Sequence, residues 1–316
     1  MNNKKVFIAG HNGMVGSAVF EELKHLGYSN IVTKTKKELN LLDQKAVESF
    51  FCRERPDFVV NCAARVGGIL ANNSKRADFI YENTQISTNI IHCSWKLNVR
   101  KLINLGSSCI YPKESKIPIK EEYLLSSFLE NTNEPYAIAK INALKMCEAY
   151  YDQYNNNFYS LMPSNLFGEK DNFDLNSSHV LPAIIRKVHD AKINKRNTIE
   201  VWGSGKPLRE FLYIKDLARV VGFCLEKVNA KDIYSQGISC LNTGSDDEVS
   251  ILDLTKTIME VLNFDAEIIL DKSKPDGTYR KKMDNTRLKS LGFKYKYSLE
   301  QALKNTYDFY IKNYGN

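Results

Sequence analysis

A serine, a tyrosine and a lysine are spaced in this chain so that they could do acid–base chemistry at a carbon bearing oxygen. Tyr136 and Lys140 are four residues apart in a segment of helical character, which places both on one face of a helix. A nearby ammonium stabilises a phenolate and lowers its pKa from about 10. Ser107 directly follows an expected strand, and its hydroxyl can polarise a substrate carbonyl. These groups together predict hydride transfer to or from such a carbon.

A glycine-rich turn at residues 10–16 supplies a place for a dinucleotide. It follows the first expected strand and opens the first expected helix, the arrangement that holds a pyrophosphate at the positive end of a helix. The first glycine permits the tight turn, the second lets the backbone approach the pyrophosphate, and the third lets helix and strand pack closely. We expect Lys140 to hold the nicotinamide ribose and the turn to contribute Gly10, Asn12, Gly13, Met14, Val15 and Gly16.

The segment after the second expected strand favours NADP over NAD. An acidic residue usually ends this strand, where it binds the ribose 2′-hydroxyl and repels a 2′-phosphate. Here Lys34 and Lys36 occupy the segment, and a lysine attracts that phosphate. A solvated basic turn is nearly as good an interpretation, so NADH stays an alternative cofactor. Asp43 either accepts a hydrogen bond from the adenine amine or caps the helix that follows it.

Strand and helix patterns alternate through the first half of the chain, which predicts an α/β protein with a Rossmann-type, doubly wound parallel sheet. There we expect strands at 6–9, 30–34, 58–62, 101–106 and 158–162, and helices at 15–26, 44–55, 78–98 and about 135–153. In the second half we expect helices at 180–191, 214–228, 251–262 and 299–310 and a strand at 198–202. This organisation predicts a dinucleotide-binding domain over residues 1–163 and a smaller α/β substrate-binding lobe over 164–316, with later segments re-entering the first domain.

Composition excludes several classes of protein. Hydrophobic residues make up 43% and charged residues 26%, which is ordinary globular usage, and no apolar run approaches the ~18 residues of a membrane helix. The net charge of +7 is spread out, which suits phosphates rather than nucleic acid. Seven irregularly spaced cysteines without a CxxC pair predict neither a disulfide framework nor a metal site. Reduced thiols, and a start too weakly apolar for a signal peptide, predict a cytoplasmic protein.

Longer strings in the sequence resemble the GDP-L-fucose synthases, a family of extended short-chain dehydrogenase/reductases. That family inverts carbons 3 and 5 of a GDP-4-keto-6-deoxymannose and reduces carbon 4 with NADPH. The resemblance therefore implies a GDP-sugar substrate, and a homodimer formed through the helices expected at 78–98 and 135–153. It covers nearly the whole chain, through strings at residues 7–11, 38–43, 66–69, 106–112, 133–140, 178–180, 201–205, 209–211 and 274–278.

The resemblance also implies a role for each matching residue. Tyr136 donates a proton to the carbon-4 oxygen, with Lys140 and Ser107 in support. Cys109 resembles the base of the epimerisation and His179 the matching acid, since removing a proton on one face and returning it on the other needs two groups. Contacts to the nucleotide sugar are implied for Asn165, Val180, Lys187, Trp202 and Arg209.

Departures from the family pattern leave other interpretations open. The family often has arginine where this chain has Asn12, Lys36 and Lys187, and lysine keeps the charge without the bidentate fork. Such changes fit a 4-keto-reductase acting on a related sugar, for example a GDP-4-keto-heptose, with a separate epimerase. A dehydratase would carry an Asp-Glu pair where Ser108 and Cys109 stand. A 4-epimerase would retain its NAD, and a non-catalytic dinucleotide-binding regulator would typically lack the Tyr-Lys pair.

Overall fold

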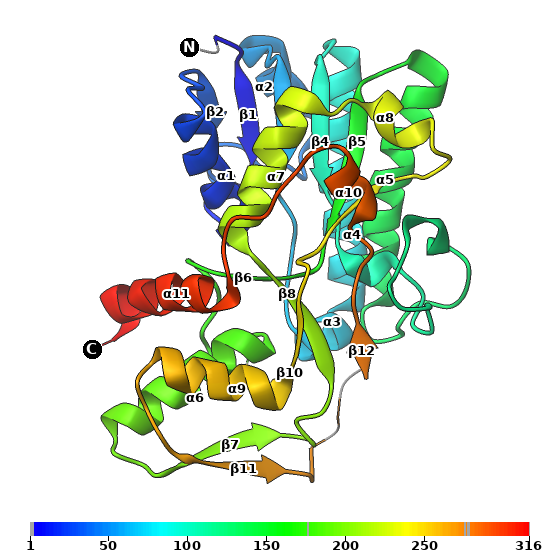
Figure 1. Ribbon diagram of the computed structural model, residues 1–316. Helices are drawn as coiled ribbons and strands as arrows, with labels where there is room; N and C mark the ends of the chain where they lie inside the picture. Colours follow the sequence, from blue (N-terminus) through cyan, green and yellow to red (C-terminus); the bar gives the residue numbers. More distant parts are fainter. Residues whose placement is uncertain (1–2, 176, 275, 277–278, 316) are drawn as a thin grey trace.

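Six parallel strands form the central sheet of the computed structural model, which describes residues 3–175, 177–274, 276 and 279–315 (Figure 1). The chain places β2 on one side of β1 and then crosses to place β3 on the other, so the strand order reverses between β1 and β3. Dinucleotides bind at such a point, outside the carboxyl ends of the strands. The Rossmann-type sheet is thus confirmed, with its strands in the order β2 (Ile31–Thr33), β1 (Val6–Ala9), β3 (Phe58–Asn61), β4 (Lys101–Leu105), β5 (Phe158–Pro163) and β9 (Leu241–Thr243).

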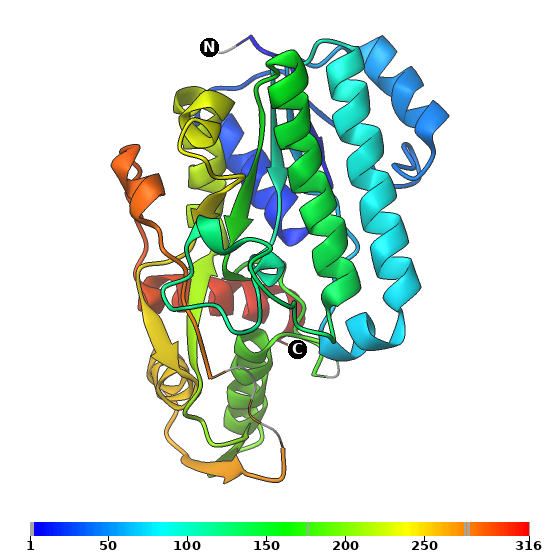
Figure 2. The ribbon, with the colours of Figure 1, turned by 90° about the vertical axis from the view of Figure 1, so that its right-hand side faces the viewer.

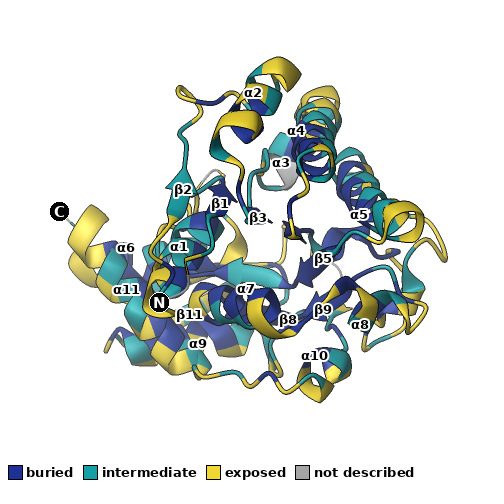
Figure 3. Cartoon of the chain, turned by 90° about the horizontal axis from the view of Figure 1, so that it is seen from above, coloured by how far each residue is buried: buried dark blue, intermediate teal, exposed yellow. Residues whose placement is uncertain are grey.

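Helices cover both faces of this sheet, which explains why its strands are apolar without alternation. Val6 and Ile8 of β1 pack in the cluster that includes α1 (Met14–His25) and α7 (Ile214–Lys227). Phe7 and Ala9 point to the opposite face, in a cluster with residues of α2 (Gln44–Glu54), α4 (Arg76–Lys96) and α5 (Glu134–Tyr154). Seen from above, the helices have their buried residues on the side that faces the sheet and their exposed residues on the side that faces solvent (Figure 3).

A smaller lobe lies beyond the carboxyl ends of the central strands (Figure 1). It contains a small sheet in which β8 pairs with β6, β10 and β12, and a separate parallel pair of β7 and β11. Its strands are β6 (Asn165–Phe167), β7 (Thr198–Trp202), β8 (Leu208–Tyr213), β10 (Glu248–Ser250), β11 (Glu267–Asp271) and β12 (Arg280–Lys281). Its main helices are α6 (Val180–Ile193), α9 (Ile251–Val261) and α11 (Leu299–Tyr314).

Several segments connect the two parts. Strand β9 and helix α7 come from the second half of the chain but belong to the central sheet and its covering layer. The assignment of dinucleotide binding to residues 1–163 and of substrate binding to 164–316 stays a prediction. The remaining short elements are α3 (Ile69–Ser74), the 3-10 turns η1 (Ser108–Ile110) and η2 (Glu121–Tyr123), α8 (Ala230–Tyr234) and α10 (Thr286–Ser290).

The carboxyl end of α7 is capped from within the sheet. Lys101, a buried residue of β4, donates its ammonium hydrogens to the carbonyl oxygens of Leu225 and Val228, each at 2.8 Å. The Tyr159 hydroxyl on β5 donates to the Cys224 carbonyl at 2.9 Å. The last carbonyls of a helix have no partner within it, so a buried lysine at this point satisfies them and complements the helix dipole.

We expect Lys101→Met to lower the free energy of unfolding by about 2–4 kcal/mol, because it removes charged hydrogen bonds and leaves buried carbonyls without donors. Urea unfolding followed by circular dichroism measures this loss. Lys96→Met is the matched control: Lys96 is an exposed helix lysine paired with Glu48, and its loss should leave the free energy of unfolding almost unchanged. Equal stabilities of the two variants would contradict the capping role.

Candidate functional site

Two of the three glycines in the turn after β1 are required by packing. Gly10 has a φ of +80°, which favours glycine, and a Cβ there would lie 2.8 Å from the Cα of Ala63, after β3. A Cβ on Gly16 would collide with the Gly10 carbonyl oxygen. These positions let α1 begin directly against the ends of β1 and β3, at the reversal of strand order.

Gly13 is required for a different reason. A Cβ there would meet only the Gly10 oxygen, at 3.5 Å, so the protein itself leaves room for a side chain. Gly13 is exposed and forms the N-cap of α1 without any side-chain cap, so the N–H groups of the first turn stay available. An open, uncapped helix start fits a pyrophosphate, which such N–H groups bind.

Gly13 and Gly16 should therefore respond differently to replacement by alanine. We expect Gly13→Ala to change the free energy of unfolding by less than about 1 kcal/mol but to weaken NADPH binding at least about tenfold, since its methyl group occupies the pyrophosphate's place. Gly16→Ala should lower stability by about 1–3 kcal/mol through overpacking. Thermal unfolding and fluorescence titration of NADPH test both variants. Unchanged NADPH affinity in Gly13→Ala would place the dinucleotide elsewhere.

The turn after β2 contains both positive and negative charge. Lys34 lies 3.5 Å from the Glu38 carboxylate, which also accepts hydrogen bonds from the backbone N–H and the hydroxyl of Thr35, both at 2.8 Å. Lys36 is exposed, and it stays the residue that we expect to meet a 2′-phosphate. Glu38 was not foreseen as part of this turn. Asp43 caps α2, because its Oδ1 accepts a hydrogen bond from the Ala46 N–H at 3.0 Å.

An acid–base cluster forms where β4 ends and α5 begins. The Lys140 ammonium donates to the carbonyl oxygen of Leu105, the last residue of β4, at 2.8 Å and lies 5.7 Å from the ring centre of Tyr136. Ser107 is the N-cap of η1, and its hydroxyl oxygen accepts a hydrogen bond from the Cys109 N–H at 3.4 Å. The buried Cys109 interacts electrostatically with both Tyr136 and Lys140. The structure thus brings four of the five expected catalytic residues together at the edge where the glycine turn lies.

Burial dominates the protonation of this cluster. It lowers the pKa of Lys140 to about 8 and raises the pKa of Tyr136 well above 10, with Cys109 adding to the rise. Burial, rather than Lys140, therefore sets the direction of the Tyr136 pKa shift. The phenol therefore stays protonated at neutral pH, as a proton donor must be. Burial also raises the pKa of Cys109, and the nearby Lys281 and Lys140 oppose that rise.

Two of the expected substrate-binding residues of the smaller lobe, Lys187 and Trp202, lie side by side. The Lys187 ammonium on α6 lies 5.1 Å from the ring centre of Trp202, which is 57% exposed, and Lys274 lies 5.4 Å from the same ring. Arg209 on β8 is half-buried, which lowers its pKa, although a guanidinium stays charged. An exposed indole between ammonium groups can stack with a planar base and attract a diphosphate. In the string at 274–278, residues 275, 277 and 278 lie outside the described part.

The remaining expected residues, Asn165, His179 and Val180, lie in the sequence between the acid–base cluster and Lys187. Asn165 on β6 donates its amide to the Glu210 carbonyl at 3.1 Å. His179 is the N-cap of α6, and both it and Val180 are exposed; the protein atoms around the imidazole still lower its pKa by desolvation. The loop before His179 reaches the first lobe, since a Cβ on Gly68 would lie 3.2 Å from the Ser177 oxygen. The approach of His179 to Cys109 stays a prediction.

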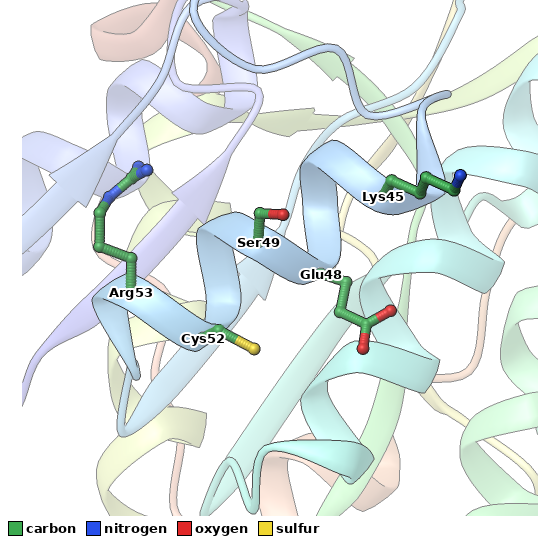
Figure 4. A pocket seen from close by; sticks show the side chains of 5 residues that line it. All are labelled: Lys45, Glu48, Ser49, Cys52 and Arg53. Atoms are coloured by element: carbon green, nitrogen blue, oxygen red, sulfur yellow. The ribbon is translucent and has the colours of Figure 1, made fainter.

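An open hollow elsewhere has no part in this site. It lies on the outer side of α2, and its lining comes from that single helix (Figure 4). None of the residues expected to bind or react lines it. Its lining residues are Lys45, Glu48, Ser49, Cys52 and Arg53.

Comparison with known proteins agrees with this geometry. Residues 6–237, which carry the glycine turn and the acid–base cluster, match the NAD dependent epimerase/dehydratase family. The chain belongs to this family. It is 49% identical to GDP-L-fucose synthase 1 of Arabidopsis thaliana, over 99% of this chain and 94% of that protein. It is 46% identical to the GDP-L-fucose synthase of Escherichia coli K12, over 99% of this chain and 98% of that protein. The resemblance to GDP-L-fucose synthases is thus confirmed.

A solved structure shares the whole fold. It is a GDP-mannoheptose C4 reductase from Campylobacter jejuni with NADP bound, 36% identical to this chain. The TM-score is 0.90, and the match covers 98% of this chain and 99% of that one. GDP-L-fucose synthases and a GDP-mannoheptose C4 reductase therefore both resemble this protein, and its sequence identity to the GDP-L-fucose synthases is higher.

Proposed function

We propose that this protein reduces carbon 4 of a GDP-4-keto-6-deoxyhexose with NADPH after inverting carbons 3 and 5. The observation that carries the proposal is the position of Tyr136, Lys140, Ser107 and Cys109 at the carboxyl ends of the strands that also carry the glycine turn. Relatives at 46–49% identity over nearly the full chain are GDP-L-fucose synthases, which supports this substrate class.

In the reduction, NADPH when bound supplies a hydride to the sugar. The protonated Tyr136 phenol gives its proton to the carbon-4 oxygen as negative charge develops there. The Ser107 hydroxyl donates a hydrogen bond to the same oxygen, which stabilises that charge in a water-poor site. The buried Lys140 ammonium, fixed by the Leu105 carbonyl, adds positive charge beside the phenol.

In the epimerisation, Cys109 acts as base and His179 as acid. The thiolate takes the proton from the carbon next to the ketone, and the electron pair of the C–H bond moves to the carbon-4 oxygen as an enolate. Tyr136 and Ser107 stabilise that enolate by hydrogen bonding. The imidazolium then returns a proton to the opposite face, so a thiolate and an imidazolium become a thiol and an imidazole. The carbon is inverted without any change of oxidation state.

The GDP portion is assigned to the smaller lobe, where Lys187, Trp202 and Arg209 lie. Asn165 and Val180, at the start of β6 and of α6, are assigned to the sugar pocket. The alternative is a 4-keto-reductase for a GDP-4-keto-heptose without epimerisation, which the likeness to the GDP-mannoheptose C4 reductase favours. The greater identity to the GDP-L-fucose synthases and the presence of Cys109 beside the acid–base cluster favour the bifunctional enzyme.

The proposal is tested by incubating the protein with GDP-4-keto-6-deoxymannose, a GDP-4-keto-heptose and either NADPH or NADH. With the hexose and NADPH, we expect the absorbance of the reduced nicotinamide to fall by one equivalent of NADPH for each sugar reduced. Faster turnover of the heptose would favour the alternative, and faster turnover with NADH would contradict the assignment of Lys36. No cofactor consumption with any sugar would overturn the reductase.

A cytoplasmic homodimer completes the proposal. No helix in the described part of the chain is both long and apolar enough to span a bilayer. Helices α4 and α5 run side by side at one surface (Figure 2), where Tyr81, Ile138 and Tyr154 are 62%, 43% and 45% exposed. Exposed apolar side chains along two adjacent helices support pairing with a second copy, which would form a four-helix contact. Light scattering should give twice the chain mass, and a monomer would contradict the dimer.

A further inference from the structure

Lys281 is a charged residue of the site that sequence reasoning did not identify. It lies at the end of β12, directly opposite Arg209 on the parallel neighbour β8. Register partners on neighbouring strands point to the same face, so Lys281 and Arg209 share one face. Arg280, the preceding residue, points to the other face and pairs with Glu248.

The segment that follows β12 packs against the segment that carries Cys109. The carbonyl of Lys282 accepts a hydrogen bond from the Ile119 N–H at 2.8 Å. Met283 shares a buried cluster with Ile119 and with Ile110, the neighbour of Cys109. This packing places the Lys281 ammonium within electrostatic range of the Cys109 sulfur.

The Lys281 ammonium is not used elsewhere. Within the described part of the chain it has neither an ion pair nor a hydrogen bond, and the residue is partly buried. Glu130 is the carboxylate that acts on it, and Glu130 is already paired with Lys113 at 3.2 Å. The other charged group facing Lys281 is Arg209, which is also positive. A partly buried, unpaired ammonium is costly, which points to a negative partner during the reaction.

We propose that Lys281 is a positioning residue that stabilises the thiolate of Cys109 and so prepares it as the base of the epimerisation. The inference rests on the proposed function and deepens it. Two ammonium groups then flank the sulfur: Lys140 from α5 and Lys281 from β12. The other groups that face Cys109 are the Ser107 hydroxyl and the Tyr136 phenol, both neutral. Because Cys109 is buried, the thiolate needs these cations to form near neutral pH.

The test measures how fast Cys109 is alkylated by iodoacetamide as pH is varied, with the modified peptide quantified by mass spectrometry. Only the thiolate reacts, so the rate reports the Cys109 pKa without any need for turnover. Lys281→Met removes one cation and should shift the profile upward by about one pH unit, which lowers the rate about tenfold below the midpoint. Lys281→Arg keeps the charge and should keep the wild-type profile.

Lys282→Met is the matched control, since the charge of Lys282 acts on Glu210 and Glu248 rather than on Cys109. Its profile should coincide with that of the wild type. A wild-type profile in Lys281→Met, or an equal shift in Lys282→Met, would overturn the proposal. If Lys281→Met does not fold, loss of the wild-type profile in Lys281→Arg would overturn it.

Solvent deuterium exchange at carbons 3 and 5 without NADPH, measured in parallel, separates this inference from the proposed function. Exchange that occurs in the wild type and is slower in Lys281→Met, with an unchanged substrate KM, supports both the inference and the proposed function. Absent exchange in the wild type together with a shifted alkylation profile would overturn the epimerase and keep the electrostatic role. A raised KM with an unshifted profile would instead assign Lys281 to diphosphate binding and overturn the proposal.

Discussion

Replacing Tyr136 by Phe should lower kcat for carbon-4 reduction by about 10²–10⁴, the usual contribution of one positioned proton donor. The reason is specific: the phenol is the protonated group in the cluster, and burial keeps it protonated. The ring itself should stay in place, because it packs edge-on against Phe79 with centroids 6.1 Å apart. NADPH affinity should change by less than about threefold, since the residues that we expect to bind the dinucleotide, at the start of α1 and at Lys140, are unchanged. Single-turnover absorbance and fluorescence titration measure the two effects.

Tyr81→Phe is the control for that experiment, because Tyr81 loses the same hydroxyl at a position that is 62% exposed on α4. It should keep full activity. Wild-type turnover in Tyr136→Phe would contradict its role as proton donor. An equal loss of NADPH binding and turnover would show that the hydroxyl serves the cofactor instead.

Replacing Cys109 by Ala should slow inversion at carbons 3 and 5 by about 10²–10⁴, because no other group of the acid–base cluster combines a nucleophilic sulfur with two adjacent cations. Reduction should persist for a sugar supplied in the already inverted form, since Tyr136, Ser107 and Lys140 are unchanged. The measurement is deuterium uptake from solvent into the sugar, followed by NMR, beside NADPH consumption with each sugar.

Cys52→Ala, which changes an exposed cysteine on α2, is the control and should leave both rates unchanged. Deuterium uptake at the wild-type rate in Cys109→Ala would show that another base removes the proton. Loss of both reactions together would show that the sulfur supports the fold of η1 rather than proton transfer.

Many of the strands and helices could be predicted from the sequence because each follows a local pattern. Strand β1 of the central sheet and strand β7 of the smaller lobe match their expected ranges, and α1 and α2 begin within one residue of prediction. Both helices begin at recognisable signals, the glycine turn and the Asp43 cap. The four-residue spacing of Tyr136 and Lys140 survives as one face of α5 because a helix fixes that geometry whatever surrounds it.

The rest depends on contacts between distant segments. Strands β6 and β12 are only three and two residues long, and both form by pairing with β8, so no local period predicts them. Lys281 comes within electrostatic range of Cys109 because β12 lies beside β8 and because Met283, just after β12, shares a buried cluster with Ile110 of η1. The effect of burial on the Tyr136 pKa could not be predicted either, since burial is a property of the folded chain. Glu38 was overlooked because its carboxylate joins the Lys34 turn through Thr35.

The most direct measurement is the NMR spectrum of the sugar formed from GDP-4-keto-6-deoxymannose and NADPH in deuterated water. The account predicts one product with carbons 3 and 5 inverted and deuterated, carbon 4 reduced, and one NADPH oxidised per molecule. A reduced product that keeps protium and the starting configuration at carbons 3 and 5 would contradict the role given to Cys109 and His179. An unreduced sugar would contradict the account as a whole.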